Sequence, residues 1–227
     1  MTAPYLSQLA TEWRRTLPAW TIGECKHDGF RGLYLRDRSG KPGLFTRNGM
    51  TIPGAEHILH ELAAWERHAG HRLFIDGEFI VDGPDTLAAT KHWCETGHKL
   101  GGTAGRLMVF DGFAYDDWLK GGTATPLYQR KARIEAIAAA VADDEAHRWE
   151  WRPGSRGADA GEPVRVVPHV ELMHVDDALC MVAQMWRAGL EGIVLKDAEA
   201  GYSRTRNAAW QKVGRPWQDK IRWKEAA

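Results

Sequence analysis

The sequence predicts an α+β fold with a sheet-rich centre, and two observations carry this prediction. Short patterns typical of β-strands alternate along the chain with longer amphipathic patterns typical of helices. Several neighbouring strand patterns are separated only by turn sequences, which favours antiparallel hairpins. A chain of 227 residues can form one large domain or two small ones, and we expect a single domain over residues 1–227.

Glycine and proline delimit the elements expected in the first half of the chain. The helix over residues 53–70 has Pro53 at its start and Gly70 at its end. Asp76-Gly77 is a common hairpin turn. In chain order we expect an amphipathic helix over residues 4–17, strands over 20–26, 31–37 and 43–49, a helix over 53–70, a hairpin over 71–83 and a helix over 85–93.

The second half of the chain contains a long helical pattern over residues 125–147. A loop is expected over residues 151–163, where glycine and proline gather among charged residues. The other expected elements are a strand with an irregular continuation over 105–118, a strand over 164–174, a helix over 175–192, a strand over 193–197 and one or two strands over 208–227.

Composition excludes several classes of protein. No apolar run approaches the roughly 20 residues that a membrane span needs, and the N-terminus lacks the features of a secretory signal. Cys25, Cys94 and Cys180 fit neither a disulfide framework nor a CxxC zinc site. We therefore expect a cytoplasmic protein that does not bind membranes, and we expect it to be a monomer.

The charge balance is neutral, with 30 basic and 30 acidic residues, which argues against a protein that coats nucleic acid indiscriminately. The C-terminal segment 204–227 differs, because residues 204–225 carry seven basic side chains and two acidic ones. A basic segment of this kind either contacts phosphates or is a solvated tail, and the sequence leaves both interpretations open.

The sequence GECKHDGFRG, residues 23–32, is unusual for the end of a strand. Lys26 lies outside any apolar alternation and is followed by Asp28 and Arg31. One interpretation is a strand that ends in an Asp-Gly hairpin turn. The other is a lysine nucleophile at a strand end, with Asp28 and Arg31 placed around a nucleotide.

A lysine that attacks phosphorus must be a neutral amine, and it needs partners. Cations neutralise a triphosphate, carboxylates hold magnesium, and an aromatic ring with a polar neighbour binds a purine. Each requirement has a candidate downstream, although each candidate also has an ordinary interpretation as a turn, core or surface residue. In chain order the candidates are Arg47, Glu78, Phe110, Glu191, Lys196 and Lys212.

Six short motifs resemble those of the covalent nucleotidyltransferase superfamily, which contains ATP-dependent DNA ligases, RNA ligases and mRNA capping enzymes. In order they are KHDGFR, FTRNG, DGEF, VFDGF, EGIVLKD and WQKV, within residues 24–213. The sequences TRNGMTIPGAEHIL and IDGEFIVDG look most similar to small bacteriophage DNA ligases. The resemblance implies an ATP-grasp-like adenylation domain with antiparallel sheets flanked by helices.

The resemblance also implies a role for each candidate residue. Lys26 would attack the α-phosphate of ATP and hold AMP as a phosphoramidate, while Lys196 and Lys212 neutralise the charge that builds there. Glu78 and Glu191 would support the ribose and bind Mg²⁺ or Mn²⁺. The other implied roles are an adenine hydrogen bond for Glu24, a ribose or phosphate contact for Arg31, a 5′-phosphate contact for Arg47 and stacking on adenine for Phe110.

Two departures from the family pattern bear on function. The fifth motif usually carries two lysines separated by one residue, but here Lys212 is followed by Val213 and Gly214. DNA ligases also continue into an OB-fold domain, whose sixth motif is only faintly similar to RPWQDK, residues 215–220. We expect no C-terminal OB-fold and no NAD-specific domain, and therefore ATP as the cofactor.

The leading interpretation is an ATP-dependent DNA ligase that seals nicked duplex DNA. An RNA ligase is an alternative, since some RNA ligases lack an OB-fold. A second alternative is a partner-dependent nucleotide-binding module without complete ligase activity, although intact Lys26, Glu191 and Lys196 argue against a decayed site. The sequence is also compatible with one domain of a longer protein.

Overall fold

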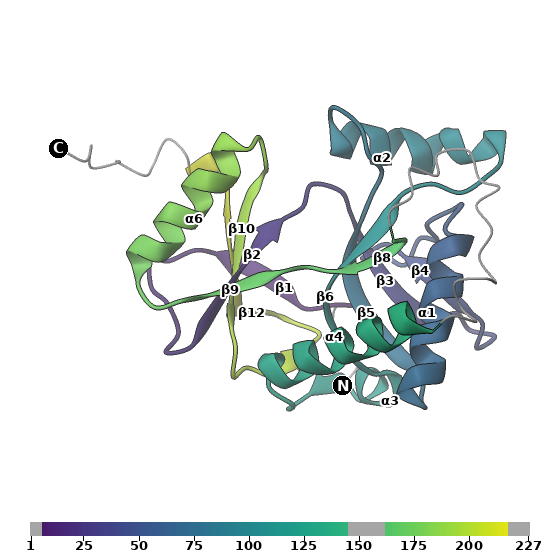
Figure 1. The fold of residues 1–227 in the computed structure, drawn as a ribbon, viewed down its shortest axis with the longest axis horizontal. Coiled ribbons are helices and arrows are strands. Elements are labelled where there is room, and N and C mark those ends of the chain that lie inside the picture. Colours follow the sequence, from purple (N-terminus) through teal and green to yellow (C-terminus); the bar gives the residue numbers. More distant parts are fainter. Residues whose placement is uncertain (1–5, 145–161, 218–227) are drawn as a thin grey trace. The chain divides into compact units, whose positions relative to one another are not determined.

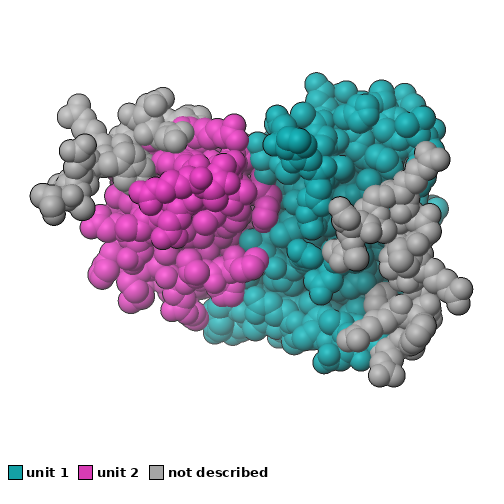
Figure 2. All heavy atoms as spheres, turned by 45° about the horizontal axis from the view of Figure 1, so that its top comes forward, with its two compact units in different colours: residues 1–8, 28–167, 201–205 teal, residues 9–27, 168–200, 206–227 magenta. Residues whose placement is uncertain are grey.

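The computed structural model describes residues 6–144 and 162–217, and the chain divides into two compact units (Figures 1 and 2). Each unit is built around a five-stranded sheet. Unit 1 comprises residues 1–8, 28–167 and 201–205, and unit 2 comprises residues 9–27, 168–200 and 206–227.

The large sheet of unit 1 has the strand order β4-β3-β5-β6-β8. Its strands are antiparallel to their neighbours except for β6 and β8, which run parallel. The bounds of the strands are Phe30–Arg36 for β3, Pro42–Phe45 for β4, Leu73–Ile80 for β5, Arg106–Ala114 for β6 and Val164–Val166 for β8.

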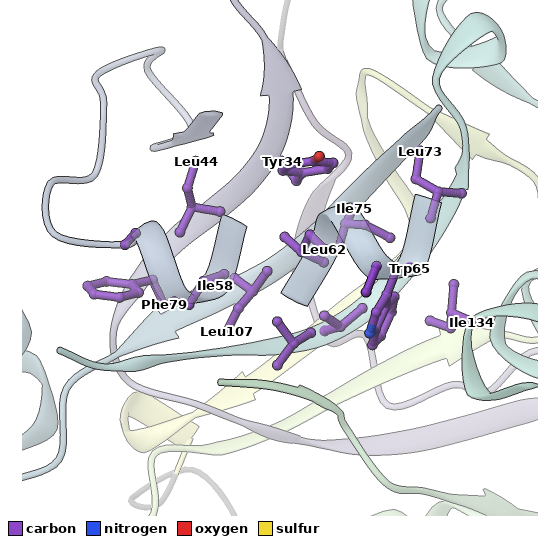
Figure 3. Packing of buried hydrophobic residues seen from close by; sticks show 14 of the residues in the cluster. Tyr34, Leu44, Ile58, Leu62, Trp65, Leu73, Ile75, Phe79, Leu107 and Ile134 are labelled. Atoms are coloured by element: carbon purple, nitrogen blue, oxygen red, sulfur yellow. The ribbon is translucent and has the colours of Figure 1, made fainter. Parts of the chain in front are cut away.

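Helices α1 (Glu56–Ala69) and α4 (Leu127–Asp143) cover one face of this sheet (Figure 1). Figure 3 shows Leu62 and Trp65 of α1 beside Ile75 of β5 in the resulting core. The strand residues in this core include Tyr34, Leu73, Ile75, Phe79, Leu107 and Val109. Because side chains alternate along a strand, the intervening residues of β3 and β5 point to the opposite face.

The remaining elements of unit 1 are short. A helix, α2, and a 3₁₀ turn, η1, follow β5, and the helix α3 follows β6. Two short strands, β7 and β11, pair with each other in an antiparallel ribbon. The bounds are Thr86–Glu95 for α2, Gly97–Leu100 for η1, Tyr115–Leu119 for α3, Gly122–Thr123 for β7 and Tyr202–Ser203 for β11.

Unit 2 has a sheet of strand order β1-β12-β10-β2-β9, in which β1 and β12 are parallel and the other neighbours antiparallel. Helix α6 (Val175–Arg187) lies on one face of this sheet (Figure 1). The bounds are Leu9–Glu12 for β1, Thr21–Lys26 for β2, His169–Leu172 for β9, Gly192–Asp197 for β10 and Arg206–Gly214 for β12, with a 3₁₀ turn, η2, at Arg215–Trp217.

The core of unit 2 forms between α6 and one side of the sheet. Ala178 and Val182 of α6 pack with Ile193 and Leu195 of β10 and with Val213 of β12. Side chains alternate along a strand, so those at the intervening positions, which include Val194, Lys196 and Lys212, project from the face that α6 does not cover.

The α+β fold predicted from the sequence is confirmed, as are the helices expected over residues 53–70, 85–93, 125–147 and 175–192, with bounds that differ by a few residues. The sheets are mainly antiparallel, but the β1–β12 and β6–β8 pairs are parallel. No OB-fold is found among the described residues. Residues 151–161 of the expected loop and residues 218–227 of the basic segment lie outside them.

The amphipathic helix expected over residues 4–17 is wrong. Residues 6–17 contain no helix, and Leu9–Glu12 forms β1. This strand pairs in parallel with β12, almost 200 residues further along the chain, and the bond from Trp13 N–H to the carbonyl of Lys212, at 3.2 Å, continues the contact. The edge of the sheet therefore supplies hydrogen-bond partners for a backbone segment that the local sequence pattern would have placed in a helix.

Two strand predictions need correction. The expected hairpin over residues 71–83 is a single strand, β5, and Asp76-Gly77 lies within it, opposite a bulge in β6. A β-carbon on Gly77 would come within 2.7 Å of the carbonyl oxygen of Met108, so glycine serves close strand approach here, not a turn. The strand expected over residues 164–174 is two strands, β8 and β9, separated at Pro168, which has no N–H to donate.

None of the helices in the described part of the chain has the length and apolar character that a membrane span requires.

Candidate active site

Strands β2, β10 and β12 place charged side chains on the face of the unit 2 sheet that α6 leaves uncovered. In the antiparallel register Glu24 lies opposite Val194, which lies opposite Lys212. Lys196 lies opposite Ile22 on one side and Trp210 on the other. Residues directly opposite in a sheet share a face, so the sequence alternation gathers these cations and carboxylates together.

Glu24 and Lys196 form a buried ion pair. Their Oε2 and Nζ atoms are 2.6 Å apart, and each side chain is 2% exposed. The Lys196 ammonium also lies 4.3 Å from the centroid of the Trp210 ring, a cation–π distance. A buried charge is stable only with such partners, so this pair holds both side chains in fixed positions on the sheet face.

Lys26, at the end of β2, forms an ion pair with Glu191. Both side chains are partly accessible, at 25% and 22% exposed. Glu191 precedes Gly192, which is the register partner of Lys26. The indole N–H of Trp186 donates to the carbonyl oxygen of Glu191 at 3.0 Å, which fixes the start of β10. Lys26 is therefore reachable from solvent and touches one carboxylate.

Gly192 allows this arrangement because its backbone has a φ of 150°. A β-carbon there would lie 2.0 Å from the carbonyl oxygen of Val213 on the neighbouring strand. Another residue at this position would push β10 away from β12. Such a shift would displace the adjacent Glu191 from Lys26.

Cys25 is the other potential nucleophile next to Lys26. Burial raises the pKa of its thiol, and the Glu191 carboxylate raises that pKa further. The thiolate is the reactive form of cysteine. Cys25 is therefore a thiol at neutral pH, and Lys26 is the better candidate.

Lys212 lies on β12 and pairs with Glu12 of β1 at 3.0 Å, Nζ to Oε1. Its side chain is 41% exposed and that of Glu12 is 64% exposed. An exposed pair of this kind is weak. The ammonium of Lys212 can therefore exchange Glu12 for another anion at small cost.

Unit 1 carries a second polar cluster on the sheet face opposite α1 and α4. Arg31 of β3 donates two hydrogen bonds to Asp76 of β5, Nε to Oδ1 at 2.5 Å and Nη2 to Oδ2 at 2.6 Å. Tyr202 of β11 donates its hydroxyl to Asp76 Oδ2 at 2.6 Å. Burial would lower the pKa of Arg31, but the Asp76 carboxylate outweighs burial and raises it, so Arg31 stays charged.

Asp76 and Tyr202 are themselves shifted by burial. Burial raises the pKa of Asp76, against the lowering effects of Arg31 and of the Tyr202 hydrogen bond. Burial and the Asp76 charge raise the pKa of Tyr202 well above its usual value. The tyrosine hydroxyl therefore remains a hydrogen-bond donor throughout the physiological pH range.

Phe110 and Glu78 lie near this cluster. The guanidinium carbon of Arg31 is 4.6 Å from the centroid of the Phe110 ring, and Phe110 is the inserted residue of the β6 bulge. Glu78 is the register partner of Arg31 and accepts a hydrogen bond from the Gly29 N–H at 3.2 Å. Arg47 is exposed in the turn that follows β4.

A family model for the ATP-dependent DNA ligase domain matches residues 1–213. The chain belongs to this family. No curated protein matches the sequence. The solved structures show the same fold at identities below 25%, and the chain spans about half the length of the first of them, Pmar-Lig_PreS3.

Three of these ligase structures illustrate the likeness. Pmar-Lig_PreS3 has a TM-score of 0.71 at 19% identity, over 93% of this chain and 47% of that one. An ATP-dependent DNA ligase from bacteriophage T7, in complex with ATP, has a TM-score of 0.71 at 16% identity, over 94% and 70%. The Chlorella virus DNA ligase–adenylate has a TM-score of 0.62 at 14% identity, over 91% and 67%.

The ligase-domain residues predicted from the sequence fall into two groups. The structure brings one group together on the unit 2 sheet and another on the unit 1 sheet, and it leaves Arg47 in an exposed turn. The first group is Glu24, Lys26, Glu191, Lys196 and Lys212, and the second is Arg31, Glu78 and Phe110.

Sequence analysis missed several residues that hold these groups in place. Most of them are joined to the site by contacts between distant parts of the chain, which a local motif does not record. Two of them lie within the family motifs, Asp76 as the first residue of DGEF and Trp210 as the first residue of WQKV. The missed residues are Gln8, Glu12, Asp76, Trp186, Tyr202 and Trp210.

A divalent metal would find few protein ligands here. Among the described residues no group of three or more histidine, cysteine, aspartate or glutamate side chains could hold a metal ion. Magnesium keeps several water ligands and is usually bound by one or two carboxylates together with substrate phosphates. Single carboxylates such as Glu78 and Glu191 therefore suit magnesium that arrives with a triphosphate, not a resident metal.

Proposed function

We propose that this chain is the adenylation domain of an ATP-dependent DNA ligase, spanning residues 1–227, which seals nicks in duplex DNA through an AMP adduct on Lys26. One observation carries the proposal: Lys26 is an accessible lysine whose ammonium touches Glu191, on a sheet face that also bears Lys196 and Lys212. Membership of the ligase-domain family supports it, as do similar structures described as an ATP complex and a ligase–adenylate.

In the first step the neutral amine of Lys26 attacks the α-phosphorus of ATP. The new N–P bond forms as the bond from that phosphorus to the bridging oxygen breaks, and pyrophosphate leaves. The ammonium proton must leave Nζ first, and Glu191 is the base in contact with it. Lys196 and Lys212 would offset the negative charge that increases on the α-phosphate in the transition state.

In the second step the 5′-phosphate at the nick attacks the same phosphorus, the N–P bond breaks, and Lys26 regains its proton. The nick 3′-hydroxyl then displaces AMP. Mg²⁺ or Mn²⁺, held by Glu78 or Glu191 with the nucleotide phosphates, would lower the charge of the triphosphate. The remaining contacts with adenine, ribose and phosphate are proposed for the residues to which the family resemblance assigns them, Glu24, Arg31, Arg47 and Phe110.

Nicked duplex DNA is the proposed substrate, with nicked RNA as the alternative. The basic C-terminal segment 204–227 is proposed to contact phosphates. We also propose that the protein acts as a monomer in the cytoplasm, in line with its cysteine content.

The test is incubation with ATP labelled at the α-phosphate and Mg²⁺, followed by nicked DNA or nicked RNA. We expect an acid-labile, alkali-stable AMP adduct on the protein that is lost in Lys26→Ala and retained in Lys91→Ala, a lysine on the exposed surface of α2. Labelling of the Lys26→Ala variant would show that Lys26 is not the nucleophile. An adduct that passes AMP to nicked RNA but not to nicked DNA would favour the alternative substrate.

A further inference from the structure

A closed hydrogen-bonded ring joins four residues of unit 1 that lie far apart in sequence. The Asp76 carboxylate is fully buried and accepts bonds from Arg31 and Tyr202. The backbone of Gln8 completes the ring: its N–H donates to the Tyr202 hydroxyl oxygen at 2.9 Å, and its carbonyl accepts from Arg31 Nη2 at 3.0 Å. Every bond in the ring restricts the guanidinium of Arg31 directly or through one neighbour.

Tyr202 is the central donor in this ring. Its hydroxyl oxygen accepts a hydrogen bond from the Gln8 N–H, and its hydroxyl donates one to Asp76. This bond helps to hold the carboxylate in its orientation toward Arg31. The tyrosine ring packs against Phe74 and Phe113, with centroids 5.5 and 4.9 Å away. The hydroxyl is therefore held in place by an apolar socket that does not depend on the polar network.

The ring also reaches the residue predicted to stack on adenine. Arg31 lies against the Phe110 ring at 4.6 Å, so the position of the guanidinium limits the position of the aromatic ring. A long arginine side chain that is free to sample its rotamers loses conformational entropy when it is fixed. All the bonds of the ring are made between protein groups, so they can fix the guanidinium without a ligand.

We infer that Tyr202, anchored by the Gln8 backbone, is a positioning residue that preorganises Arg31 and Phe110 for the nucleotide. This inference rests on the proposed function, because it takes Arg31 to contact ATP. Tyr202 itself is 2% exposed and donates its hydroxyl to Asp76, so its effect on the nucleotide would pass through Arg31.

The opposite face of the same sheet provides a matched control. Tyr34 is fully buried and donates its hydroxyl to Glu66 Oε2 at 3.2 Å, and Arg36 donates to both oxygens of Glu66 at 2.7 Å. Tyr34, Glu66 and Arg36 thus repeat the chemistry of Tyr202, Asp76 and Arg31 on the helix-covered side. Tyr34→Phe removes a buried hydroxyl donor to a paired carboxylate without touching the candidate site.

The first measurement is the ATP dependence of single-turnover adenylation in Tyr202→Phe and Tyr34→Phe. We expect the ATP concentration for half-maximal rate to rise about tenfold in Tyr202→Phe, the loss expected for one hydrogen bond to a charged group, with a smaller change in the maximal rate. Tyr34→Phe should leave the half-maximal ATP concentration and the maximal rate unchanged. It should lower the melting temperature about as much as Tyr202→Phe does. Equal ATP dependence in the two variants would overturn the inference.

The second measurement follows the Arg31 Nε–H signal by NMR without ATP. We expect a sharp signal, slow to exchange with solvent, that broadens in Tyr202→Phe and not in Tyr34→Phe. An unchanged signal in Tyr202→Phe would show that Asp76 alone positions Arg31, and the inference would fail.

Arg31→Ala separates the two proposals. If the Arg31 signal depends on Tyr202 but Arg31→Ala binds ATP normally, then Arg31 has no role in nucleotide binding, and that part of the proposed function fails while the positioning stands. If Arg31→Ala weakens ATP and Tyr202→Phe does not, the positioning inference fails alone. In an Arg31→Ala background, Tyr202→Phe should have no further effect on ATP.

Discussion

Glu24 on β2 and Lys196 on β10 form an ion pair of 2.6 Å on neighbouring strands, with each side chain 2% exposed. Neither residue faces its partner directly in the register, since Glu24 lies opposite Val194 and Lys196 lies opposite Ile22. The pair is therefore diagonal and links two positions of the sheet. Its burial makes each charge dependent on the other.

Removing one partner of this pair should destabilise the fold strongly. We expect Lys196→Met to lower the free energy of unfolding by about 3–5 kcal/mol, because Glu24 is left buried and uncompensated. The double variant Glu24→Gln, Lys196→Met should recover much of this loss. Urea unfolding measures all three values.

An exposed ion pair gives the matching control. Lys120 and Asp117 lie 3.0 Å apart, with side chains 73% and 38% exposed. Lys120→Met should change the free energy of unfolding by less than about 1 kcal/mol. A loss in Lys196→Met as small as that in Lys120→Met would mean that water reaches Glu24 and that the pair is not buried in solution.

Lys212 should matter for chemistry more than for stability. We expect Lys212→Ala to change the free energy of unfolding by less than about 1 kcal/mol, because its pair with Glu12 is exposed. The rate of adenylation at saturating ATP should fall about 100-fold, as when one charge-stabilising group is removed from a transition state. Single-turnover kinetics with labelled ATP measures this rate.

Glu12→Gln tests whether the ion pair itself is needed. This variant breaks the same contact but keeps the Lys212 ammonium, so the adenylation rate should stay the same or rise. An equal fall in Glu12→Gln and Lys212→Ala would indicate that the pair supports the β1–β12 contact and that Lys212 has no direct role at the phosphate.

The sequence predicted the helices well because their signals are local. α1 is amphipathic and ends at Gly70, whose φ of 71° is the left-handed conformation expected of a glycine cap. The same local reasoning failed at β1, because pairing with β12 depends on residues almost 200 positions away. It failed again at Asp76-Gly77, where a bulge in another strand decides the backbone.

The candidate site divides in a similar way. Lys26 was recognisable because its charged neighbours form a contiguous motif. The sequence did not reveal the ion pair of Lys26 with Glu191 or that of Glu24 with Lys196, because each pair depends on the register of β2 with β10. Tyr202 gave no sequence signal, because its partner Gln8 is 194 residues away. Motifs therefore located the candidate residues, and only the fold revealed which contacts position them.

The basic residues after position 203 should not all contact DNA. The guanidinium carbon of Arg204 lies 4.1 Å from the centroid of the Trp118 ring, and its Nη1 donates to the Trp118 carbonyl at 3.3 Å. Arg206 donates to the carbonyl of Ala10 at 2.6 Å. Arg215, by contrast, is exposed. Two of these arginines thus have structural contacts, and Arg215 is available for phosphates.

We therefore expect different effects from two charge-removing variants. Arg204→Gln should lower the melting temperature and leave the salt dependence of nicked-DNA binding unchanged. Arg215→Gln should leave the melting temperature unchanged and reduce the log–log salt slope by about 0.9, the value for one phosphate contact. Removal of residues 215–227 should reduce the slope further and slow the sealing of a pre-adenylated nick. Binding titrations at several salt concentrations measure the slopes, and an unchanged slope after the truncation would identify the segment as a solvated tail.

His57, in the first turn of α1, should make the stability of the fold depend on pH. Its Nε2 lies 2.8 Å from the carbonyl oxygen of Gly105 and donates to it. Burial lowers the pKa of His57, although the Gly105 bond and the nearby Glu56 carboxylate act in the opposite direction. The folded protein therefore favours the neutral imidazole.

The sign of the effect follows from proton binding. Above pH about 6.5, the usual pKa of histidine, His57 is neutral in both the folded and the unfolded chain. As the pH falls below this value the unfolded chain binds a proton before the folded chain does, so the free energy of unfolding falls, by at most about 1.4 kcal/mol per pH unit for one group. His57→Gln keeps a donor for Gly105 but does not titrate. It should flatten the pH dependence of the free energy of unfolding, measured with urea, between pH 6.5 and the lower pKa of the folded state.

The control is His71→Gln, at an exposed histidine, which should keep the wild-type pH dependence of the free energy of unfolding. An equal flattening in both variants, or none in His57→Gln, would show that His57 titrates normally in the folded protein.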